Sequence, residues 1–273
     1  TARIVSGCTN PNIKLVSWIH IEQHTKELAS KSFRSYKEAL DCYSKFDRTV
    51  CVSDTVKDDL KSIFDTKKPV EVLYNTNESE KIKKLSDEKV DDVNFSKDII
   101  NIISVAKIVP SKGYDRLMKI HKKLIEKNIK NHIYILGIGE EKEKYEKYLA
   151  ENNLTDTFTF LGYRDNPYKY VKKADLYVCS SRREGFSTAV TEALIVGTPV
   201  VSTNCSGAYE LLGKNNEYGI VTENDEDALY EGIKKMLTMP DLLEAYAAKA
   251  KERGKAFSTE KTVKAVEEML LSI

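Results

Sequence analysis

Two glutamates lie close together in the stretch REGFSTAVTEALIVGTPVV, which begins at Arg183. Glu184 and Glu192 have seven residues between them, and the serine–threonine pair in that interval offers an N-cap for a helix that Gly197 would end. This pattern predicts Glu184 in the loop before a helix and Glu192 one turn inside it. Carboxylates so placed can accept hydrogen bonds from sugar hydroxyls, and a helix N-terminus attracts phosphate. The pair indicates a ligand with a sugar and a phosphate, and the alternative is two solvated charges.

Two lysines could complete such a site. The stretch SVAKIVPSKGYDRL places Lys107 at the end of a predicted strand and Lys112 in the loop before an amphipathic helix. Two ammonium groups in one short strand-to-helix loop can bind a diphosphate. A P-loop would need the pattern G-x-x-x-x-G-K-[ST], which this stretch lacks. The alternative is two surface lysines in a lysine-rich chain.

A glycine turn follows the predicted strand HIYILG. Gly137 and Gly139 resemble the start of a dinucleotide-binding motif, but Lys142 stands where the third glycine would be. The close helix packing of that motif is then missing, which disfavours NAD. We interpret Gly137 as part of a tight turn that lines the ligand crevice or serves the turn alone.

No motif predicts a metal site. Asp225 and Asp227 directly precede a predicted helix, where acidic residues complement the helix dipole, so capping is favoured over metal binding. The four histidines show no H-E-x-x-H spacing, and His121, on a lysine-rich amphipathic stretch, is expected at the surface. The five cysteines form no C-x-x-C pair, as is typical of reduced thiols in the cytosol.

Composition limits the partners. The chain has 273 residues with 43 Lys+Arg and 42 Asp+Glu, so no overall basic field favours nucleic acid. No apolar run approaches the roughly 18 residues that span a bilayer, and the first residues lack the apolar core of a signal peptide. These features predict a soluble, cytoplasmic chain.

Alternation of strands and helices predicts the fold. From about residue 97, apolar runs such as DIINIISV, HIYILG, DLYVCS and PVVST alternate with amphipathic stretches, which indicates βα units and a doubly wound parallel sheet. Three further strands, IKLVSWIH, FDRTVCVS and PVEVLYN, precede this region with helical patterns between them. Charged residues 77–96 interrupt the rhythm, so we expect a domain break there.

The ordered motifs resemble glycosyltransferase family 4, the retaining GT-B enzymes of bacterial surface polysaccharide synthesis. EGFSTAVTE is similar to the E-x7-E signature, VPSKGYDRL to the donor-phosphate loop, and FLGY, ADLYVCSSRREGF and GTPVVST follow in the family's order. The resemblance covers roughly residues 10–240. It implies two Rossmann-like doubly wound domains: a partial, truncated acceptor-side domain at residues 1–90 and a donor-binding domain at residues 91–256. Residues 257–273 would form a C-terminal helix that could return to the first domain.

The resemblance also implies roles for individual residues. Lys112 would hold the diphosphate, with Lys107 beside it where the family usually has arginine. Glu184 would contact the transferred sugar and Glu192 the ribose. His20, in WIHIE, would contact the donor sugar or the acceptor, so Glu184, Lys112 and His20 form the implied catalytic set.

The other implied donor-binding residues act through their backbones or line the crevice. The residues after FLG would read the base edge, the start of the helix would approach the phosphate, and the glycine turn would line the crevice. These residues are Tyr163, Arg164, Gly185, Phe186, Ser187, Thr188 and Gly137.

The implied reaction transfers a sugar, commonly from a UDP-sugar, to a glycan or lipid-linked acceptor with retention and without a metal or other cofactor. Front-face attack is the usual mechanism, and a carboxylate nucleophile, for which Glu184 is the nearest candidate, is the alternative. Other functions left open are a non-catalytic nucleotide-sugar-binding partner subunit and a UDP-sugar epimerase of GT-B architecture. The basic side chains of residues 26–37 leave peripheral contact with the inner membrane face open, although a solvated helix face is favoured.

Overall fold

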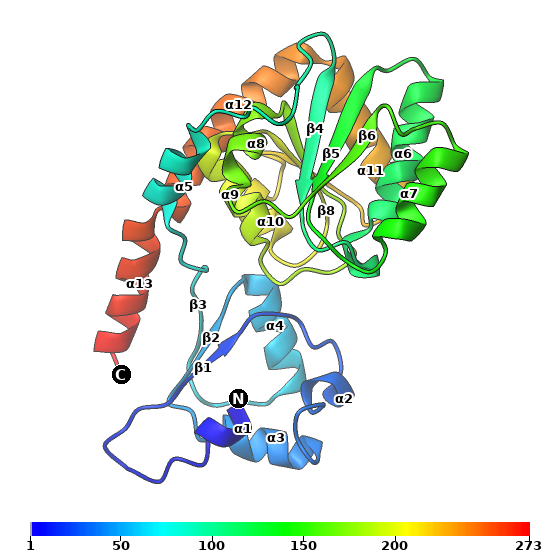
Figure 1. Cartoon of the computed structure of the whole chain (residues 1–273). Helices are drawn as coiled ribbons and strands as arrows, with labels where there is room; N and C mark the ends of the chain where they lie inside the picture. Colours follow the sequence, from blue (N-terminus) through cyan, green and yellow to red (C-terminus); the bar gives the residue numbers. More distant parts are fainter. Residues whose placement is uncertain (1) are drawn as a thin grey trace. The chain divides into compact units, whose positions relative to one another are not determined.

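Parallel strands alternate with helices along the chain in the computed structural model, which describes residues 2–273 (Figure 1). The chain folds into two compact units. Of the described residues, the first unit comprises 2–76, 184–186 and 260–273, and the second comprises 77–183 and 187–259. Residues 77–90 therefore pack in the second unit, although the family resemblance implies that they belong to the first domain.

The first unit contains a three-stranded parallel sheet in the order β1-β2-β3. Its strands are β1 (Val16–Ile19), β2 (Arg48–Cys51) and β3 (Val70–Val72). Its helices are α1 (Ala2–Val5), α2 (Lys26–Ala29), α3 (Tyr36–Tyr43), α4 (Asp54–Ile63) and most of α13 (Thr259–Leu271). Serine N-caps start α3 and α4, because the Ser35 and Ser53 side chains accept hydrogen bonds from the backbone N–H three residues on. The three strands expected from the sequence are all present.

The second unit contains a six-stranded parallel sheet in the order β6-β5-β4-β7-β8-β9. Counted within the unit, this order is 3-2-1-4-5-6, the order of a doubly wound nucleotide-binding sheet, with a topological switch point between β4 and β7. Its strands are β4 (Ile100–Val105), β5 (Asn131–Leu136), β6 (Phe158–Gly162), β7 (Leu176–Cys179), β8 (Val200–Thr203) and β9 (Ile220–Thr222). The predicted doubly wound α/β fold is confirmed.

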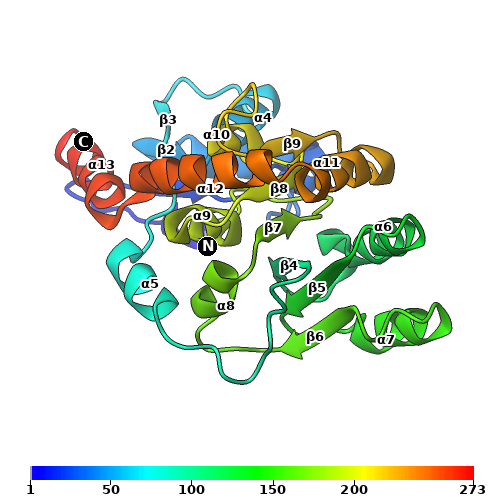
Figure 2. The same ribbon diagram turned by 90° about the horizontal axis from the view of Figure 1, so that it is seen from above.

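Helices cover both faces of this sheet (Figure 2). Those on one face are α6 (Tyr114–Glu126), α7 (Lys142–Glu151) and α11 (Glu226–Thr238), and those on the other include α8 (Tyr168–Lys173) and α9 (Thr188–Val196). The remaining helices are α5 (Ser79–Ser86), α10 (Ala208–Leu212), α12 (Pro240–Gly254) and two 3-10 turns, η1 (Pro110–Lys112) and η2 (Lys255–Phe257). Helix α5 lies within the charged residues 77–96, at which the sequence predicts a domain break.

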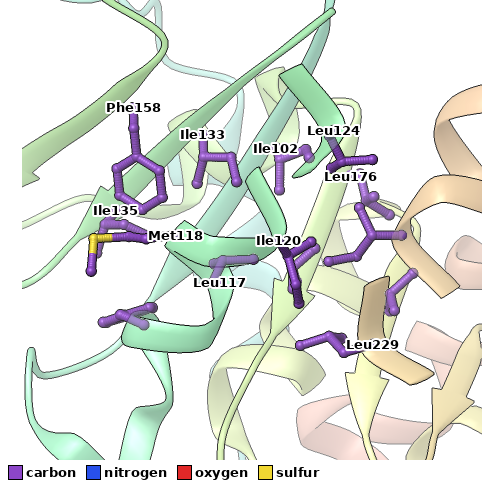
Figure 3. Close-up of a cluster of buried hydrophobic side chains, with 14 of the residues drawn as sticks. Ile102, Leu117, Met118, Ile120, Leu124, Ile133, Ile135, Phe158, Leu176 and Leu229 are labelled. Atoms are coloured by element: carbon purple, nitrogen blue, oxygen red, sulfur yellow. The ribbon is translucent and has the colours of Figure 1, made fainter. Parts of the chain in front are cut away.

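A hydrophobic cluster fills the space between the sheet and the α6 face (Figure 3). Leu117, Ile120 and Leu124 recur at helical spacing on α6 and are fully buried against residues such as Ile102 of β4 and Ile133 of β5. Because strands β4 and β5 are buried on both faces, their sequences are nearly continuous apolar runs.

His121 corrects one expectation. It lies on the same face of α6 as Leu117 and Leu124, so it is fully buried rather than at the surface. Its Nδ1 and Nε2 lie 2.8 Å and 2.9 Å from Asn131 Oδ1 and Thr157 Oγ1. Burial lowers the pKa of His121 to about 4. The expectation was wrong because the lysines around His121 outweighed its spacing from Leu117 and Leu124, which places it on the buried face of α6.

Helix α9 is enclosed by other helices of its unit. Six of its nine residues are buried, and α5, α8 and α12 pack against it. Gly254, at the end of α12, lies so close that a Cβ there would be 2.4 Å from the Leu194 carbonyl oxygen. The helix that starts after the Glu184 loop is therefore fixed from several sides.

Among residues 2–273, the structure contains no helix of the length and apolar character needed to cross a membrane.

Candidate nucleotide-sugar site

The switch point of the six-stranded sheet brings two loops together. Ligands of doubly wound sheets bind outside the carboxyl ends of the strands, where neighbouring loops diverge. After β4, the chain passes exposed Lys107 and reaches partly buried Lys112 at the end of η1, from which only Gly113 leads to α6. After β7, the chain leads to the N-terminus of α9. The two predicted lysines therefore follow the strand at which a ligand is expected.

The start of α9 agrees with the sequence prediction. Ser187 is the N-cap, and its side chain accepts a hydrogen bond from Val190 N at 3.4 Å. Thr188 is the first helical residue and is exposed, and Gly197 ends the helix in the left-handed conformation with φ 86°. The free N–H groups of this first turn can bind an anion.

Glu192 lies one turn inside α9 and is partly buried. Its Oε1 accepts a hydrogen bond from the Tyr168 hydroxyl at 3.4 Å. Burial raises the pKa of Glu192 to about 7, although the Tyr168 hydrogen bond acts in the opposite direction. A carboxylate that lacks full solvation can gain from hydrogen bonds that a diol would donate.

Glu184, Gly185 and Phe186 belong to the first unit, although the residues on both sides of them belong to the second. Phe186 is buried and stacks on Tyr74, with ring centroids 4.9 Å apart and planes at 17°. A Cβ on Gly185 would lie 1.7 Å from the His20 carbonyl oxygen, so only glycine fits this close approach. The first unit thus brings the loop of Glu184 next to His20.

The remaining predicted residues lie in turns after β5 and β6. Gly137 donates its N–H to the Gly162 carbonyl at 2.9 Å, which joins the two turns. Tyr163 is exposed, and Arg164 Nη2 lies 3.3 Å from Asp92 Oδ2. These turns leave the carboxyl ends of their strands, as the β4 and β7 loops do.

The predicted residues therefore fall into two groups. Those that lie in loops and turns at the carboxyl ends of strands of the second unit, or on α9, are Lys107, Lys112, Gly137, Tyr163, Arg164, Ser187, Thr188 and Glu192. Those that belong to the first unit are His20, Glu184, Gly185 and Phe186.

The sequence patterns did not single out Tyr168, which contacts Glu192, or Arg116 and Arg182, which contact the β4 and β7 segments. Tyr168 lies 24 residues from its partner Glu192, so no local spacing joins them. Arg116 lies on the buried face of an amphipathic helix, and a charged residue at an apolar position was the available signal.

The acidic pair near the end of the sheet is occupied by local contacts. Asp225 is the N-cap of α11 and accepts a hydrogen bond from Ala228 N at 2.8 Å. Asp227 pairs with Lys123 at 3.2 Å. The predicted capping role of Asp225 is confirmed.

Comparison with known proteins identifies the family. The family described as "Glycosyl transferases group 1" matches residues 86–253, more than half of the chain. The chain belongs to this family.

Two relatives show the range of similarity. The N-acetylgalactosamine-N,N'-diacetylbacillosaminyl-diphospho-undecaprenol 4-alpha-N-acetylgalactosaminyltransferase of Campylobacter jejuni is 31% identical over 260 residues, which cover 94% of this chain and 66% of the relative. The poly(ribitol-phosphate) alpha-N-acetylglucosaminyltransferase of Staphylococcus aureus is 24% identical over 242 residues, which cover 86% of this chain and 46% of the relative. The chain thus spans less than two thirds of the length of both relatives.

Solved structures share the fold. S. aureus TarM, in a complex that contains UDP, matches with a TM-score of 0.74 at 21% identity over 94% of this chain and 51% of TarM. Anabaena Alr3699/HepE, in complex with UDP, matches with a TM-score of 0.77 at 17% identity over 95% of this chain and 72% of HepE. The predicted GT-B fold is confirmed by these neighbours.

Proposed function

We propose that this chain is the donor-binding part of a retaining glycosyltransferase of the family 4 type, which transfers a sugar from a UDP-sugar to a glycan or lipid-linked acceptor. The observation that carries the proposal is the pair of loops at the switch point, because one holds Lys112 and the other leads to the N-terminus of α9. Membership of the group 1 family supports it. The names of the C. jejuni and S. aureus relatives, which act on lipid-linked and polymeric phosphate acceptors, suggest the acceptor class.

In this proposal each charged group has one task. Lys112, with Lys107 beside it, and the α9 N-terminus stabilise the charge that develops on the departing diphosphate. Glu192 accepts hydrogen bonds from the ribose, Glu184 contacts the hydroxyls of the transferred sugar, and His20 contacts the sugar or the acceptor. The retaining step is front-face attack, and a Glu184 nucleophile is the competing mechanism.

The lysines and the helix N-terminus supply positive charge without a metal, so the proposed reaction is metal-independent and uses no other cofactor. We expect EDTA to leave UDP binding unchanged. A loss of binding in EDTA that manganese restores would contradict this part of the proposal.

Lys112→Ala tests the phosphate assignment. Removal of one charged hydrogen bond, worth roughly 1.5–3 kcal/mol, should weaken UDP binding about ten- to a hundredfold in calorimetry. Uridine, which lacks phosphate, should bind the variant as it binds the parent chain. Equal UDP affinity in both chains would remove Lys112 from the site.

The division of work between the two glutamates is tested with three ligands. Glu192→Gln should weaken uridine, UDP and UDP-sugar alike, because the ribose is common to them. Glu184→Gln should weaken only the UDP-sugar. Identical behaviour of the two variants across the three ligands would contradict the assignment.

The alternatives predict different products. A binding subunit would hold UDP-sugar without turning it over, and an epimerase would release or isomerise it without an acceptor. A transferase releases UDP in step with glycosylation of the acceptor. Product analysis with and without acceptor, on the full-length protein, separates these three functions. The same assay on membrane and cytosolic fractions tests a cytoplasmic or peripheral location.

A further inference from the structure

Several hydrogen bonds join the two loops of the switch point directly. We call residues 106–113 the β4 loop and residues 180–183 the β7 loop. Arg182 N donates to the Ser111 carbonyl at 2.7 Å, and Ser180 Oγ donates to the Lys112 carbonyl at 2.8 Å. The backbone of the proposed phosphate-binding lysine is therefore held by the loop that follows the neighbouring strand.

An ion pair spans the same two segments. The Arg182 guanidinium donates from Nη1 and Nη2 to the two carboxylate oxygens of Asp115, both at 2.7 Å, and from Nη1 to the Pro110 carbonyl at 2.8 Å. The hydrogen bond from Arg182 lowers the pKa of Asp115. Asp115 lies three residues after Lys112, in the first turn of α6. The partly exposed Arg182–Asp115 pair therefore fixes the end of the β4 loop on its solvent side.

A buried arginine, Arg116, fixes the start of α6 on its buried side. Arg116 is 5% exposed, and its guanidinium donates to the carbonyls of Ser180, at 2.9 Å and 2.5 Å, and of Ser181, at 2.7 Å. A third donor reaches the Asn224 carbonyl at 3.3 Å. The hydrogen bonds of Arg116 thus tie α6 to the β7 loop through main-chain carbonyls.

The backbones themselves are in contact beneath these side chains. Gly113 has φ 69°, and a Cβ there would lie 2.1 Å from the Ser180 carbonyl oxygen. A side chain at this position would force the loops apart. The close approach of the two backbones therefore explains why a glycine follows Lys112.

This network is poorly explained by global stability alone. The Arg182 and Asp115 side chains are 42% and 36% exposed, and an ion pair this exposed adds little to the free energy of unfolding. Its bidentate geometry, by contrast, defines position and direction well. The pair is therefore better suited to orientation than to stabilisation.

We propose that Asp115, Arg116 and Arg182 are positioning residues for the diphosphate site. They hold the β4 loop against the β7 loop, so that Lys112 is ordered before the ligand arrives and less conformational freedom is lost on binding. This inference rests on the proposed function, because it assumes that Lys112 binds the diphosphate.

Asp115→Asn and Arg182→Lys test the inference without removing a buried group. Asp115→Asn removes the charge of the pair, and Arg182→Lys keeps the charge but loses the bidentate fork. If Lys112 and the β4 loop are less ordered in these variants, UDP binding should weaken about two- to tenfold. We expect Arg182→Lys to be the milder variant. Glu231→Gln is the matched control, because it breaks an exposed pair with Lys234 within α11.

For each chain, UDP affinity is measured by calorimetry and uridine affinity by ligand-observed NMR. The melting temperature of each chain is measured as well. We expect weaker UDP binding with unchanged uridine binding and an almost unchanged melting temperature, which a merely structural role would not produce. Arg116→Met should also lower the melting temperature, since it removes the guanidinium donors from the carbonyls of Ser180, Ser181 and Asn224.

Three results would overturn the inference. Unchanged UDP affinity in both Asp115→Asn and Arg182→Lys would overturn it and leave the proposed function standing. Equal losses for uridine and UDP would show that the pair supports the whole unit rather than the diphosphate site. A parent chain that binds no UDP would overturn the proposed function and the inference with it.

Discussion

Glu184 and Glu192 differ in their surroundings more than their sequence spacing suggests. Glu192 lies on a helix enclosed by its neighbours, and burial sets its pKa. Glu184 lies in a three-residue segment that belongs to the other compact unit, where a ring stack and a backbone contact hold it. Residues close in sequence can therefore be controlled by different parts of the molecule, one by desolvation and the other by packing of its loop.

The largest effect we expect concerns the helix side of this comparison. The pKa of Glu192 is raised by burial to about 7, so ionisation of this group costs stability as pH rises from its ordinary value of 4.5 through 7. The cost is absent below that window and complete above it, at about 3 kcal/mol. Glu192→Gln should therefore be stabilised relative to the parent chain at pH 8 and not at pH 4.

Urea denaturation of both chains at the two pH values measures this difference. Glu223→Gln, at an exposed position, serves as the control and should show no comparable gain. A Glu192→Gln difference that does not change with pH would refute the assignment, because the buried histidines are common to both chains and cancel.

A somewhat smaller effect is expected on the loop side. Gly185→Ala places a methyl group in overlap with the His20 carbonyl oxygen, and overpacking of this kind costs about 1–3 kcal/mol. The denaturation midpoint should fall. Gly162→Ala is the control, since a Cβ there would meet only the Arg164 side chain at 4.0 Å, although its φ of 72° adds about 1 kcal/mol of strain. Equal losses would mean that the loop can move away from His20 at little cost.

The ring stack gives a third, weaker test. Phe186→Leu keeps an apolar side chain but removes the aromatic contact with Tyr74, which is worth about 0.5–1.5 kcal/mol beyond burial. A double-mutant cycle with Tyr74→Leu isolates that coupling. A coupling energy of zero would show that the stack does not hold the Glu184 loop.

The smallest expected effect returns to Glu192. Tyr168→Phe removes the long 3.4 Å hydrogen bond that lowers the pKa of Glu192, so the pKa should rise slightly further. An NMR titration of the Glu192 side chain measures the shift. A fall in pKa would contradict the role given to the Tyr168 hydroxyl.

The sequence predicted the features that have a local signature. Continuous apolar runs predicted the buried strands, and the serine N-cap and Gly197 predicted the bounds of α9, because strand burial and helix caps depend on neighbouring residues. The position of Lys112 between a strand and a helix was predicted for the same reason, because the loop is short and both flanking elements have clear local patterns.

Features that depend on tertiary contacts were not predicted. The Arg182–Asp115 pair joins residues 67 apart in sequence, and Arg116 reaches carbonyls 64 and 65 residues away. The association of residues 184–186 with the first unit depends on Tyr74 and His20, which no spacing rule connects to them. His121 was misplaced because a surrounding run of lysines outweighed a single position in the helical period.

The packing of α12 on α9 has a consequence during synthesis. Helix α12 ends at Gly254, 62 positions after Glu192, and translation adds roughly 5–20 residues per second, so the apolar surface of α9 is made several seconds before α12 can cover it. Until Gly254 can approach Leu194, the apolar surface of α9 that α12 covers is exposed on the nascent chain, where it can bind the ribosome surface or chaperones. Ribosome-bound chains halted before α12 should therefore recruit chaperones more strongly than chains released after Gly254.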